Sequence, residues 1–340
     1  MKVFVYEHIT SGALIDESLP ASLADEGNKM LTAIVHDMTL LTDIELIILR
    51  DVRLKPLLDT IKPPRHRCLI IDNSPAFQQH FTRAVNQADA VLIIAPETNG
   101  ILQNLQQSVL NQNTLLLGCE PTATQICTDK LLCYQQLQSH NVLSPHTITA
   151  DEWSLNPFSS PSGFIVKPRD GAGCIDTLVF TNPTAVTAHL TSSSANIEKT
   201  IIQPYIKGKT MSLSILCDHQ SSRVLAINQQ HIKLDNGQFS FHGCSINSTD
   251  ESEFSLKQAT DIAHQTQLAI PGLWGFIGID LIVTENETYV VDINPRLTTA
   301  YVGLHQSLNL NPAQLLLTMM ALGLSTLPLS MQRNAIEIIL

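Results

Sequence analysis

Short apolar segments alternate with longer segments of helical periodicity in the first third of the chain. The short segments predict strands at residues 3–6, 44–49, 68–71, 90–95 and 114–117. Apolar residues at helical spacing predict the intervening helices at residues 23–38, 76–86 and 98–110. Strands separated by helices favour parallel βαβ units with right-handed crossovers. The pattern therefore predicts an α/β fold here, with a doubly wound parallel sheet over residues 1–118.

The pattern changes in the rest of the chain. A helix is expected at residues 128–138, with Thr128 as its N-cap, and helical spacing returns at residues 255–268. Short apolar segments predict strands at residues 164–167, 178–180, 201–204, 211–216, 223–228, 276–283 and 289–293. This pattern favours an α+β region with antiparallel sheets. We divide it into two expected domains, residues 119–200 and 201–340.

Composition and charge narrow the class of protein. Hydrophobic residues make up 44% of the chain and charged residues only 15%, which excludes wholesale disorder. The formal net charge of −11 argues against a nonspecific nucleic-acid binder or an anionic-membrane binder. A local basic pocket for phosphates remains compatible with that charge.

Cysteine content and hydropathy indicate the cell compartment in which we expect the protein. The seven cysteines contain no C-x-x-C pair, so we expect free thiols rather than a disulfide framework or a structural zinc site. No targeting segment is visible, and the uncharged stretch at residues 312–329 holds a predicted helix, residues 313–324, that is too short to span a membrane. We expect a cytoplasmic protein whose oligomeric state, a homodimer included, stays open.

Two aspartates in neighbouring apolar strands carry the strongest chemical signal. A turn at residues 285–287 predicts a hairpin that brings Asp280 close to Asp292, and Asn294 projects from the same face as Asp292. Two ionised carboxylates in an apolar sheet repel each other unless a cation is present. Oxygen-only ligands suit Mg²⁺, which takes one or two carboxylates together with substrate phosphates. The alternative is a polar strand end, with Asp292 capping the turn before Pro295.

A lysine followed at once by a glycine loop is the second signal. Lys167 ends an apolar strand, and the loop contains Gly171, Ala172 and Gly173. Backbone N–H groups of such a loop can cradle phosphates, and a fixed lysine adds a positive charge. The alternative is a hairpin whose lysine reaches solvent. An apolar strand running into a proline-containing connector at residues 201–206 is weak evidence alone, as is Lys130 in its helix.

In this order, the segments resemble the ATP-grasp superfamily of carboxylate–amine ligases over residues 119–300. The preceding region fits the pre-ATP-grasp domain of that family, which implies an ATP-grasp fold for the whole. More narrowly, the chain resembles the tyramine–glutamate ligase group, which acts in making methanofuran-type one-carbon cofactors. The segments that carry the narrower resemblance are Val5-Tyr6-Glu7, Ser11-Gly12, residues 26–31, residues 128–130 and residues 293–304.

The resemblance implies a nucleotide site. Lys130 and Lys167 would contact ATP phosphates beneath a lid formed by Gly171, Ala172 and Gly173. The strand that holds adenine would be the hinge formed by Gln203, Pro204, Tyr205 and Ile206. Many members carry an acidic residue after this strand to hold the ribose, whereas this chain offers Thr210.

The resemblance also implies the metal and the catalytic groups. Mg²⁺, with Mn²⁺ as a substitute, would be held by Asp280, Asp292 and Asn294, where many members use Glu at one of the metal positions. Arg296 would stabilise charge on the transferring phosphoryl group, with Lys167 as the second catalytic residue.

The substrate side follows from position along the chain. Four residues follow the first strand, at the edge where α/β sheets bind ligands: Tyr6, Glu7, Ser11 and Gly12. Glu7 could hold the ammonium group of a substrate, or could be a solvated loop residue. Thr298 and Thr299 lie beyond the metal site and could touch the acceptor.

Together these implications predict an ATP-dependent ligase that acts through an acyl phosphate. It would join a carboxylate, on the resemblance the side chain of glutamate, to tyramine, tyrosine or a related amine. One alternative is an ATP-grasp ligase for other amino-acid or peptide substrates. Another is a nucleotide-binding regulator that has kept the fold without turnover.

Overall fold

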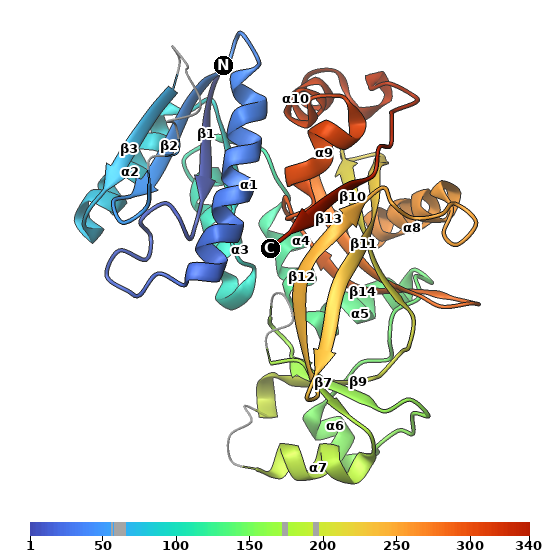
Figure 1. Ribbon diagram of the computed structural model, residues 1–340. Helices are drawn as coiled ribbons and strands as arrows, with labels where there is room; N and C mark the ends of the chain where they lie inside the picture. Colours follow the sequence, from blue (N-terminus) through green and yellow to red (C-terminus); the bar gives the residue numbers. More distant parts are fainter. Residues whose placement is uncertain (56, 58–65, 172–175, 193–196) are drawn as a thin grey trace.

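A computed structural model describes residues 1–55, 57, 66–171, 176–192 and 197–340. The first part of the chain forms a five-stranded parallel sheet of order β3-β2-β1-β4-β5 (Figure 1). Its strands are β1 (Lys2–Glu7), β2 (Glu45–Asp51), β3 (His66–Ile71), β4 (Ala90–Ile94) and β5 (Leu115–Leu116). The predicted parallel, doubly wound arrangement is confirmed.

Helices cover both faces of this sheet. The apolar face of α1 (Ala21–Thr39) packs on one side, through residues such as Leu31, Ile34 and Val35. On the other side lie α2 (Ser74–Gln87) and α3 (Ile101–Leu110). Each helix buries one stripe at helical spacing, as its sequence pattern predicts.

The rest of the chain builds a ten-stranded antiparallel sheet. Nine strands lie in the order β14-β13-β10-β11-β12-β8-β7-β9-β6, and β15 pairs with β12. The strands are β6 (Ile148–Thr149), β7 (Phe164–Pro168), β8 (Leu178–Phe180), β9 (Thr200–Pro204), β10 (Lys209–Cys217), β11 (Ser222–Asp235), β12 (Gln238–Ile246), β13 (Gly275–Val283), β14 (Thr288–Asn294) and β15 (Ile336–Ile339). The predicted antiparallel region is confirmed.

Helices of the second part form three groups. One face of β10, β13 and β14 is covered by α4 (Pro121–Thr128), α5 (Lys130–Ser139) and α8 (Leu256–Ala269). The other face meets α9 (Tyr301–Leu308) and α10 (Pro312–Leu322), which also contact α1 of the first part. The lower end holds α6 (Ala150–Leu155) and α7 (Pro183–Thr191).

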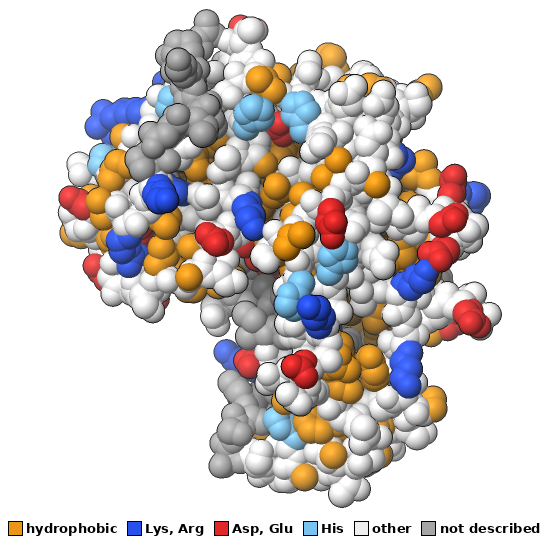
Figure 2. Space-filling model, in the orientation of Figure 1, with side chains coloured by type: hydrophobic (Ala, Val, Ile, Leu, Met, Phe, Trp, Pro, Cys, Tyr) orange, Lys and Arg blue, Asp and Glu red, His pale blue; other side chains and the backbone are white. Residues whose placement is uncertain are grey.

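The molecule has a broad upper body and a narrower lower lobe. Figure 1 places the parallel sheet and the β10, β11 and β13 part of the antiparallel sheet in the body, and β7, β9, α6 and α7 in the lobe. Figure 2 shows the same outline, with charged side chains of both signs spread over this face. Three short 3₁₀ turns complete the fold: η1 (Thr98–Gly100), η2 (Ile197–Lys199) and η3 (Leu324–Thr326).

Two helix boundaries differ from prediction. Thr128 ends α4 and is not the N-cap of the next helix, because Asp129 takes an extended conformation and accepts bonds from Leu131 N and Leu132 N, both at 3.1 Å. The predicted helix at 98–110 begins with η1, since Asn99 and Gly100 have φ of 56° and 68°. Both departures come from local backbone geometry that apolar spacing does not report.

The uncharged stretch forms α10, and Asn311 caps it. Over the described residues, no helix combines the length and the apolar character that a membrane span requires. The structure also contains elements that the sequence analysis did not predict, among them α4, α6, α7, α9, β6 and β15.

Candidate active site

The hairpin of β13 and β14 places the two aspartates opposite each other. Asp280 pairs with Asp292 across the strands, and Gly278 pairs with Asn294. The prediction that this hairpin brings the two carboxylates together is therefore confirmed. Because the residues face one another in register, their side chains project from one face of the sheet.

Asp280 is held by two amide side chains. Its Oδ1 accepts a bond from Gln230 Nε2 at 2.8 Å, and its Oδ2 accepts one from Asn294 Nδ2 at 3.2 Å. Burial and then the negative charge of Asp292 raise the pKa of Asp280 to about 7, although both amide bonds act in the opposite direction. A positive charge between the two carboxylates would relieve this repulsion.

This donor set fits a hard divalent cation. The carboxylates of Asp280 and Asp292 and the amide oxygen of Asn294 are all oxygen donors, as Mg²⁺ prefers. Within the described ranges, no group of three or more His, Cys, Asp or Glu side chains is arranged to hold a metal ion. A cation here would therefore complete its ligand shell with substrate phosphates and water.

Two buried lysines lie against the carboxylates. Lys130, the first residue of α5, approaches Asp292 Oδ2 to 3.4 Å and donates to the backbone oxygen of Gly171 at 2.5 Å. Burial opposes the charged form of Lys130, but the charge and hydrogen bond of Asp292, together with the charge of Glu97, raise the pKa of this lysine. Lys130 therefore remains a cation beside the carboxylate of Asp292.

Lys167 behaves in the opposite way. It lies on β7 and is 7% exposed, so the predicted alternative of a lysine that reaches solvent is wrong. Burial and the positive charge of Lys130 lower the pKa of Lys167 to about 8, with Asp292 acting in the opposite direction. A buried cation of this kind is stabilised by an anionic partner such as a phosphate.

The stem of the glycine loop is fastened to α5. Arg169 forms two bonds with the Asp129 carboxylate, at 2.7 and 2.6 Å, and its backbone oxygen accepts from Lys130 N at 3.0 Å. Gly171 lies at the start of the loop, whereas Ala172 and Gly173 lie outside the described residues. The described stem, Arg169 and Gly171, thus lies against Lys130.

The predicted hinge spans the last two residues of β9 and the two residues after it. The side chain of Gln203 is buried and donates to Thr147 Oγ1 at 2.8 Å, so it points into the protein. Pro204 ends the strand, and Tyr205 N donates to the backbone oxygen of Gly163 at 2.8 Å, before the half-buried Ile206. Thr210 Oγ1 donates to the backbone oxygen of Gln230 at 3.1 Å.

Arg296 meets a carboxylate from the first sheet. Its Nε lies 2.7 Å from Glu97 Oε1, and its Nη2 donates to Glu97 Oε2 at 3.1 Å. Burial works to lower the pKa of Arg296, but the charge and hydrogen bond of Glu97, together with the charges of Glu26 and Asp280, raise it. The sequence analysis missed Glu97, whose one signal is its place just beyond the most apolar strand.

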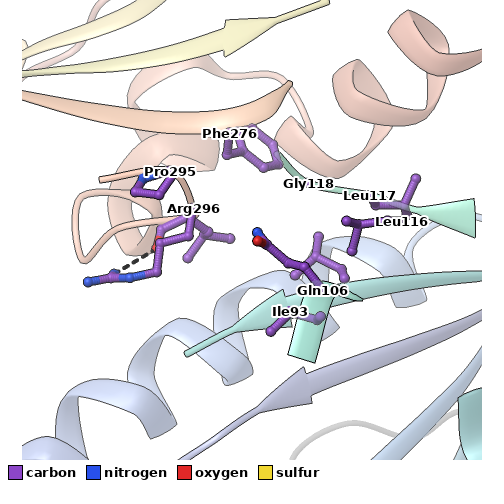
Figure 3. Close-up of a pocket in the computed structure, with 10 residues that line it drawn as sticks. Ile93, Gln106, Leu116, Leu117, Gly118, Phe276, Pro295 and Arg296 are labelled. Atoms are coloured by element: carbon purple, nitrogen blue, oxygen red, sulfur yellow. Dashed lines mark hydrogen bonds between the residues drawn. The ribbon is translucent and has the colours of Figure 1, made fainter. Parts of the chain in front are cut away.

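A small cavity lies beside this arginine, between residues of the parallel sheet region and residues of the antiparallel sheet region. Figure 3 shows Gln106 and Ile93 reaching into the cavity from the first part of the chain, with Phe276 and Pro295 opposite them. The guanidinium of Arg296 is directed away from the cavity (Figure 3), and its Nη1 donates to the backbone oxygen of Leu297 at 3.1 Å. The arginine stem is therefore held between the two parts.

Comparisons with known proteins agree with this geometry. Residues 127–300 match the ATP-grasp domain, and residues 44–124 match the pre ATP-grasp 3 domain. The chain belongs to the ATP-grasp family. Its N-terminal sheet corresponds to the pre-ATP-grasp domain, and both expectations of fold are confirmed.

The chain is similar to two curated ATP-grasp relatives, both tyramine–L-glutamate ligases. The protein from Methanocaldococcus fervens is 28% identical over 218 residues, covering 64% of this chain and 61% of the relative. The protein from Methanocaldococcus jannaschii is 27% identical over 218 residues, covering 64% of this chain and 58% of the relative. The matched region thus spans about three fifths of the length of these relatives.

A solved ATP-grasp structure shows the same fold. The ATP-grasp superfamily protein from Archaeoglobus fulgidus superposes with a TM-score of 0.67 at 23% identity, covering 93% of this chain and 88% of that one. At this identity the likeness establishes the arrangement of elements.

The loop after β1 is held together by hydrogen bonds within it. Glu7 is 3% exposed, so the alternative of a solvated glutamate is wrong. Its carboxylate accepts bonds from Ile9 N at 3.1 Å, Thr10 N at 2.7 Å and Thr10 Oγ1 at 2.6 Å. Tyr6 is buried beside it, and its hydroxyl lies 2.9 Å from His8 Nδ1.

Ser11 and Gly12, near the end of this loop, are closely packed against the protein. Ser11 Oγ donates to the backbone oxygen of His8 at 3.0 Å. Gly12 has φ of 91°, and a Cβ atom there would lie 2.6 Å from Ile71. The four residues from this segment therefore shape the loop through their contacts with the protein.

Two threonines follow Arg296 in this ATP-grasp chain. Thr299 Oγ1 donates to the carboxylate of Glu26 on α1. Thr298 packs against β13, where a Cβ atom on Gly278 would lie 2.6 Å from its methyl group. Both threonines therefore lie where α1, the β13–β14 hairpin and Arg296 meet.

Proposed function

We propose that this protein is an ATP-dependent carboxylate–amine ligase that acts through an acyl phosphate. The observation that carries the proposal is the register pairing of Asp280 with Asp292, beside the buried cations Lys130 and Lys167. The family assignment and the similarity to tyramine–L-glutamate ligases support it.

In this proposal ATP lies between β9 and the metal hairpin. Lys130 and Lys167 bind its phosphates, and Gly171, Ala172 and Gly173 close over them. Adenine and ribose lie along residues from the hinge and the strand that follows: Gln203, Pro204, Tyr205, Ile206 and Thr210. Since Gln203 and Thr210 already use their side chains within the protein, backbone groups of the hinge carry most of the recognition.

Asp280, Asp292 and Asn294 would hold Mg²⁺, or Mn²⁺ in its place. The cation would neutralise charge on the nucleotide phosphates. These residues orient the cation, and Gln230 and Asn294 orient the carboxylate of Asp280.

The reaction we propose has two steps. A carboxylate oxygen of the substrate attacks the γ-phosphorus of ATP, forming an acyl phosphate and releasing ADP. An amine nitrogen then attacks the acyl carbon, an amide bond forms, phosphate leaves and the amine loses a proton. The protein contributes positioning and charge neutralisation, with Lys167 and Arg296 as the catalytic cations.

The substrates follow from the relatives. We propose the side-chain carboxylate of glutamate and the amine of tyramine or tyrosine, in the synthesis of a methanofuran-type cofactor. Thr298 and Thr299 border the acceptor in this proposal, because they directly follow Arg296. The loop of Tyr6, Glu7, Ser11 and Gly12 frames the same side. The buried thiols suit a reducing cytoplasm.

Two alternatives remain distinct from this proposal. A ligase for other amino-acid or peptide substrates would use the same nucleotide site with another acceptor. A nucleotide-binding regulator would keep the fold without turnover. The complete set of two lysines, two aspartates and Arg296 favours a ligase, because a regulator has no need for the groups that stabilise phosphoryl transfer.

Product formation tests the proposal directly. Purified protein is incubated with Mg-ATP and L-glutamate, with tyramine, with tyrosine or with neither, and ADP, phosphate and product mass are measured in the same tubes. We expect release that depends on glutamate and one amine, with the matching amide mass. Tight ATP binding without release under any pairing would contradict the proposed substrates and favour one of the alternatives.

A further inference from the structure

The contact between Glu97 and Arg296 joins the two parts of the molecule at the site. The side chain of Glu97 is 7% exposed and that of Arg296 15% exposed. Two nitrogens of the guanidinium face the two oxygens of the carboxylate, at 2.7 and 3.1 Å. Nη2 donates a hydrogen bond to Oε2, whereas Nε and Oε1 are in ion-pair contact only. A buried ion pair anchored by one charge-assisted hydrogen bond restrains where the guanidinium lies.

The backbone around Glu97 is itself constrained. Pro96 precedes it and accepts a bond from Leu102 N at 3.1 Å. After Glu97 come the left-handed residues Asn99 and Gly100, with φ of 56° and 68°. Asn99 N donates to Asp170 Oδ2, in the stem of the glycine loop, at 2.8 Å. The turn of residues 96–100 therefore contacts both sides of the nucleotide site.

Carboxylates other than that of Glu97 also attract the guanidinium of Arg296. The negative charges of Glu26 and Asp280 also favour its cationic form, after that of Glu97. An arginine side chain is long and flexible, so without a fixed partner it would sample positions nearer the metal carboxylates. The Glu97 contact keeps the guanidinium away from those carboxylates.

We propose that Glu97 is a positioning residue, which holds Arg296 in the orientation that the phosphoryl and acyl steps require. This inference rests on the proposed ligase function. It also gives the pre-ATP-grasp domain a part in the chemistry, because that domain supplies the residue that orients a catalytic group of the other. Glu97 acts through Arg296 and does not contact the substrate.

Steady-state kinetics test the inference in the full chain. We compare wild type with Glu97→Gln, Glu97→Asp, Arg296→Ala and the double variant Glu97→Gln/Arg296→Ala. Glu45→Gln is the matched control, since Glu45 is an exposed partner of Lys2 at 3.9 Å in the same domain. The assay is amine-dependent ADP release, with kcat and the KM for ATP determined separately.

We expect Glu97→Gln to lower kcat by about 100-fold, the loss associated with a misplacement of about 1 Å, while the KM for ATP changes less than about threefold. Glu97→Asp retains the charge and should recover part of the loss. The double variant should be no slower than Arg296→Ala alone, because the two residues act as one unit. Glu45→Gln should match wild type.

Three results would overturn the inference while the proposed function stands. The first is a kcat of Glu97→Gln equal to that of wild type. The second is a loss of kcat/KM in Glu97→Gln that comes from a higher KM for ATP and not from a lower kcat. The third is a double variant whose kcat falls by the product of the two single effects. If wild type releases no ADP with any substrate pair, the proposed function fails instead. A crystal structure of Glu97→Asp then decides: a displaced guanidinium supports the inference, and an unmoved one contradicts it.

Discussion

The two buried lysines of the site differ in pKa because their charged neighbours differ. Lys130 is paired with Asp292 and keeps a raised pKa, whereas Lys167 has a pKa lowered to about 8. The difference arises because burial and the neighbouring ammonium act on Lys167 without a direct carboxylate partner among the ion pairs of the described residues. Of the two lysines, Lys167 is therefore the one whose charge depends most on the nucleotide.

The lowered pKa of Lys167 makes ATP binding depend on pH. Without nucleotide, Lys167 loses its proton as the pH rises through about 8, and phosphates raise its pKa because they favour the cation. From this group alone, affinity for Mg-ATP should be level below pH 8 and fall by up to about tenfold per pH unit above it. Calorimetric titration between pH 7 and 9.5 measures this fall.

Two variants complete the test of Lys167. Lys167→Met should bind more weakly at pH 7 and lose this fall above pH 8. Lys257→Met, at an 84% exposed lysine, should keep the wild-type profile. An affinity that stays level up to pH 9.5 in wild type would show that Lys167 does not titrate against the phosphates.

Arg296→Ala separates chemistry from nucleotide binding. Arg296 pairs with Glu97, whereas Lys130 and Lys167 are the residues that we propose to bind the phosphates. We therefore expect the ATP affinity of Arg296→Ala to stay within about threefold of wild type, and its kcat to be lower by about 100-fold or more. Equilibrium binding of Mg-ATP and ADP release are measured on the same preparation. If affinity and turnover fall equally, Arg296 is a binding residue.

At the scale of elements, α1 and the loop after β1 depend on each other. Gly27 of α1 packs against the carboxylate of Glu7, and a Cβ atom at this position would lie 2.6 Å from Glu7 Cδ. The carboxylate is buried and accepts three bonds from Ile9 and Thr10. A glycine inside a helix, normally unfavourable, is therefore required by a close approach.

Gly27→Ala should be destabilising although alanine favours helices. The substitution contributes about 1 kcal/mol of helix propensity, but displacing a buried carboxylate from its donors costs about 1–3 kcal/mol per unsatisfied group. With one group left unsatisfied, we expect a net loss of up to about 2 kcal/mol in the free energy of unfolding, measured by urea unfolding. Asp25→Ala, on an exposed position of the same helix, should stay within about 0.5 kcal/mol of wild type. A Gly27→Ala protein more stable than wild type would show that Glu7 moves freely.

At the scale of the whole molecule, α1 connects the two sheets. Figure 1 shows α1 beside α9 and α10, and one continuous apolar core includes residues from all three helices. Asp37 of α1 is 2% exposed and accepts bonds from Tyr301 OH at 2.8 Å and from His305 Nδ1 at 2.5 Å. Its backbone oxygen accepts from Asn311 Nδ2 at 2.7 Å. This buried polar contact fixes how the parts dock.

Removing one hydroxyl tests this docking. Tyr301→Phe leaves the buried Asp37 with one donor fewer, so we expect a loss of about 1–3 kcal/mol in the free energy of unfolding. Tyr289→Phe removes a hydroxyl that bonds to Glu287 at an exposed position and should change stability by less than about 0.5 kcal/mol. Equal effects of the two substitutions in urea unfolding would contradict a special role for Asp37.

Much of this architecture follows from local pattern. Strand and helix periodicity predicted the parallel sheet, and the spacing of Asp280, Asp292 and Asn294 predicted a hairpin with facing carboxylates. These signals can be read locally because side-chain direction repeats every two residues in a strand and every 3.6 in a helix. The helix boundary at Thr128 was wrong, because Asp129 competes for the backbone N–H groups that follow it.

By itself, the sequence determined the class of each sheet, the burial of its apolar faces and the pairing of Asp280 with Asp292 in the β13–β14 hairpin. Only the tertiary structure decided the partners that come from distant segments. Glu97 meets Arg296 across a separation of 199 residues, Gln230 meets Asp280 across 50, and Asp37 meets Tyr301 across 264. Periodicity describes a side chain relative to its own element, whereas these contacts depend on how whole elements dock. That docking is decided by the packing of their buried faces against one another.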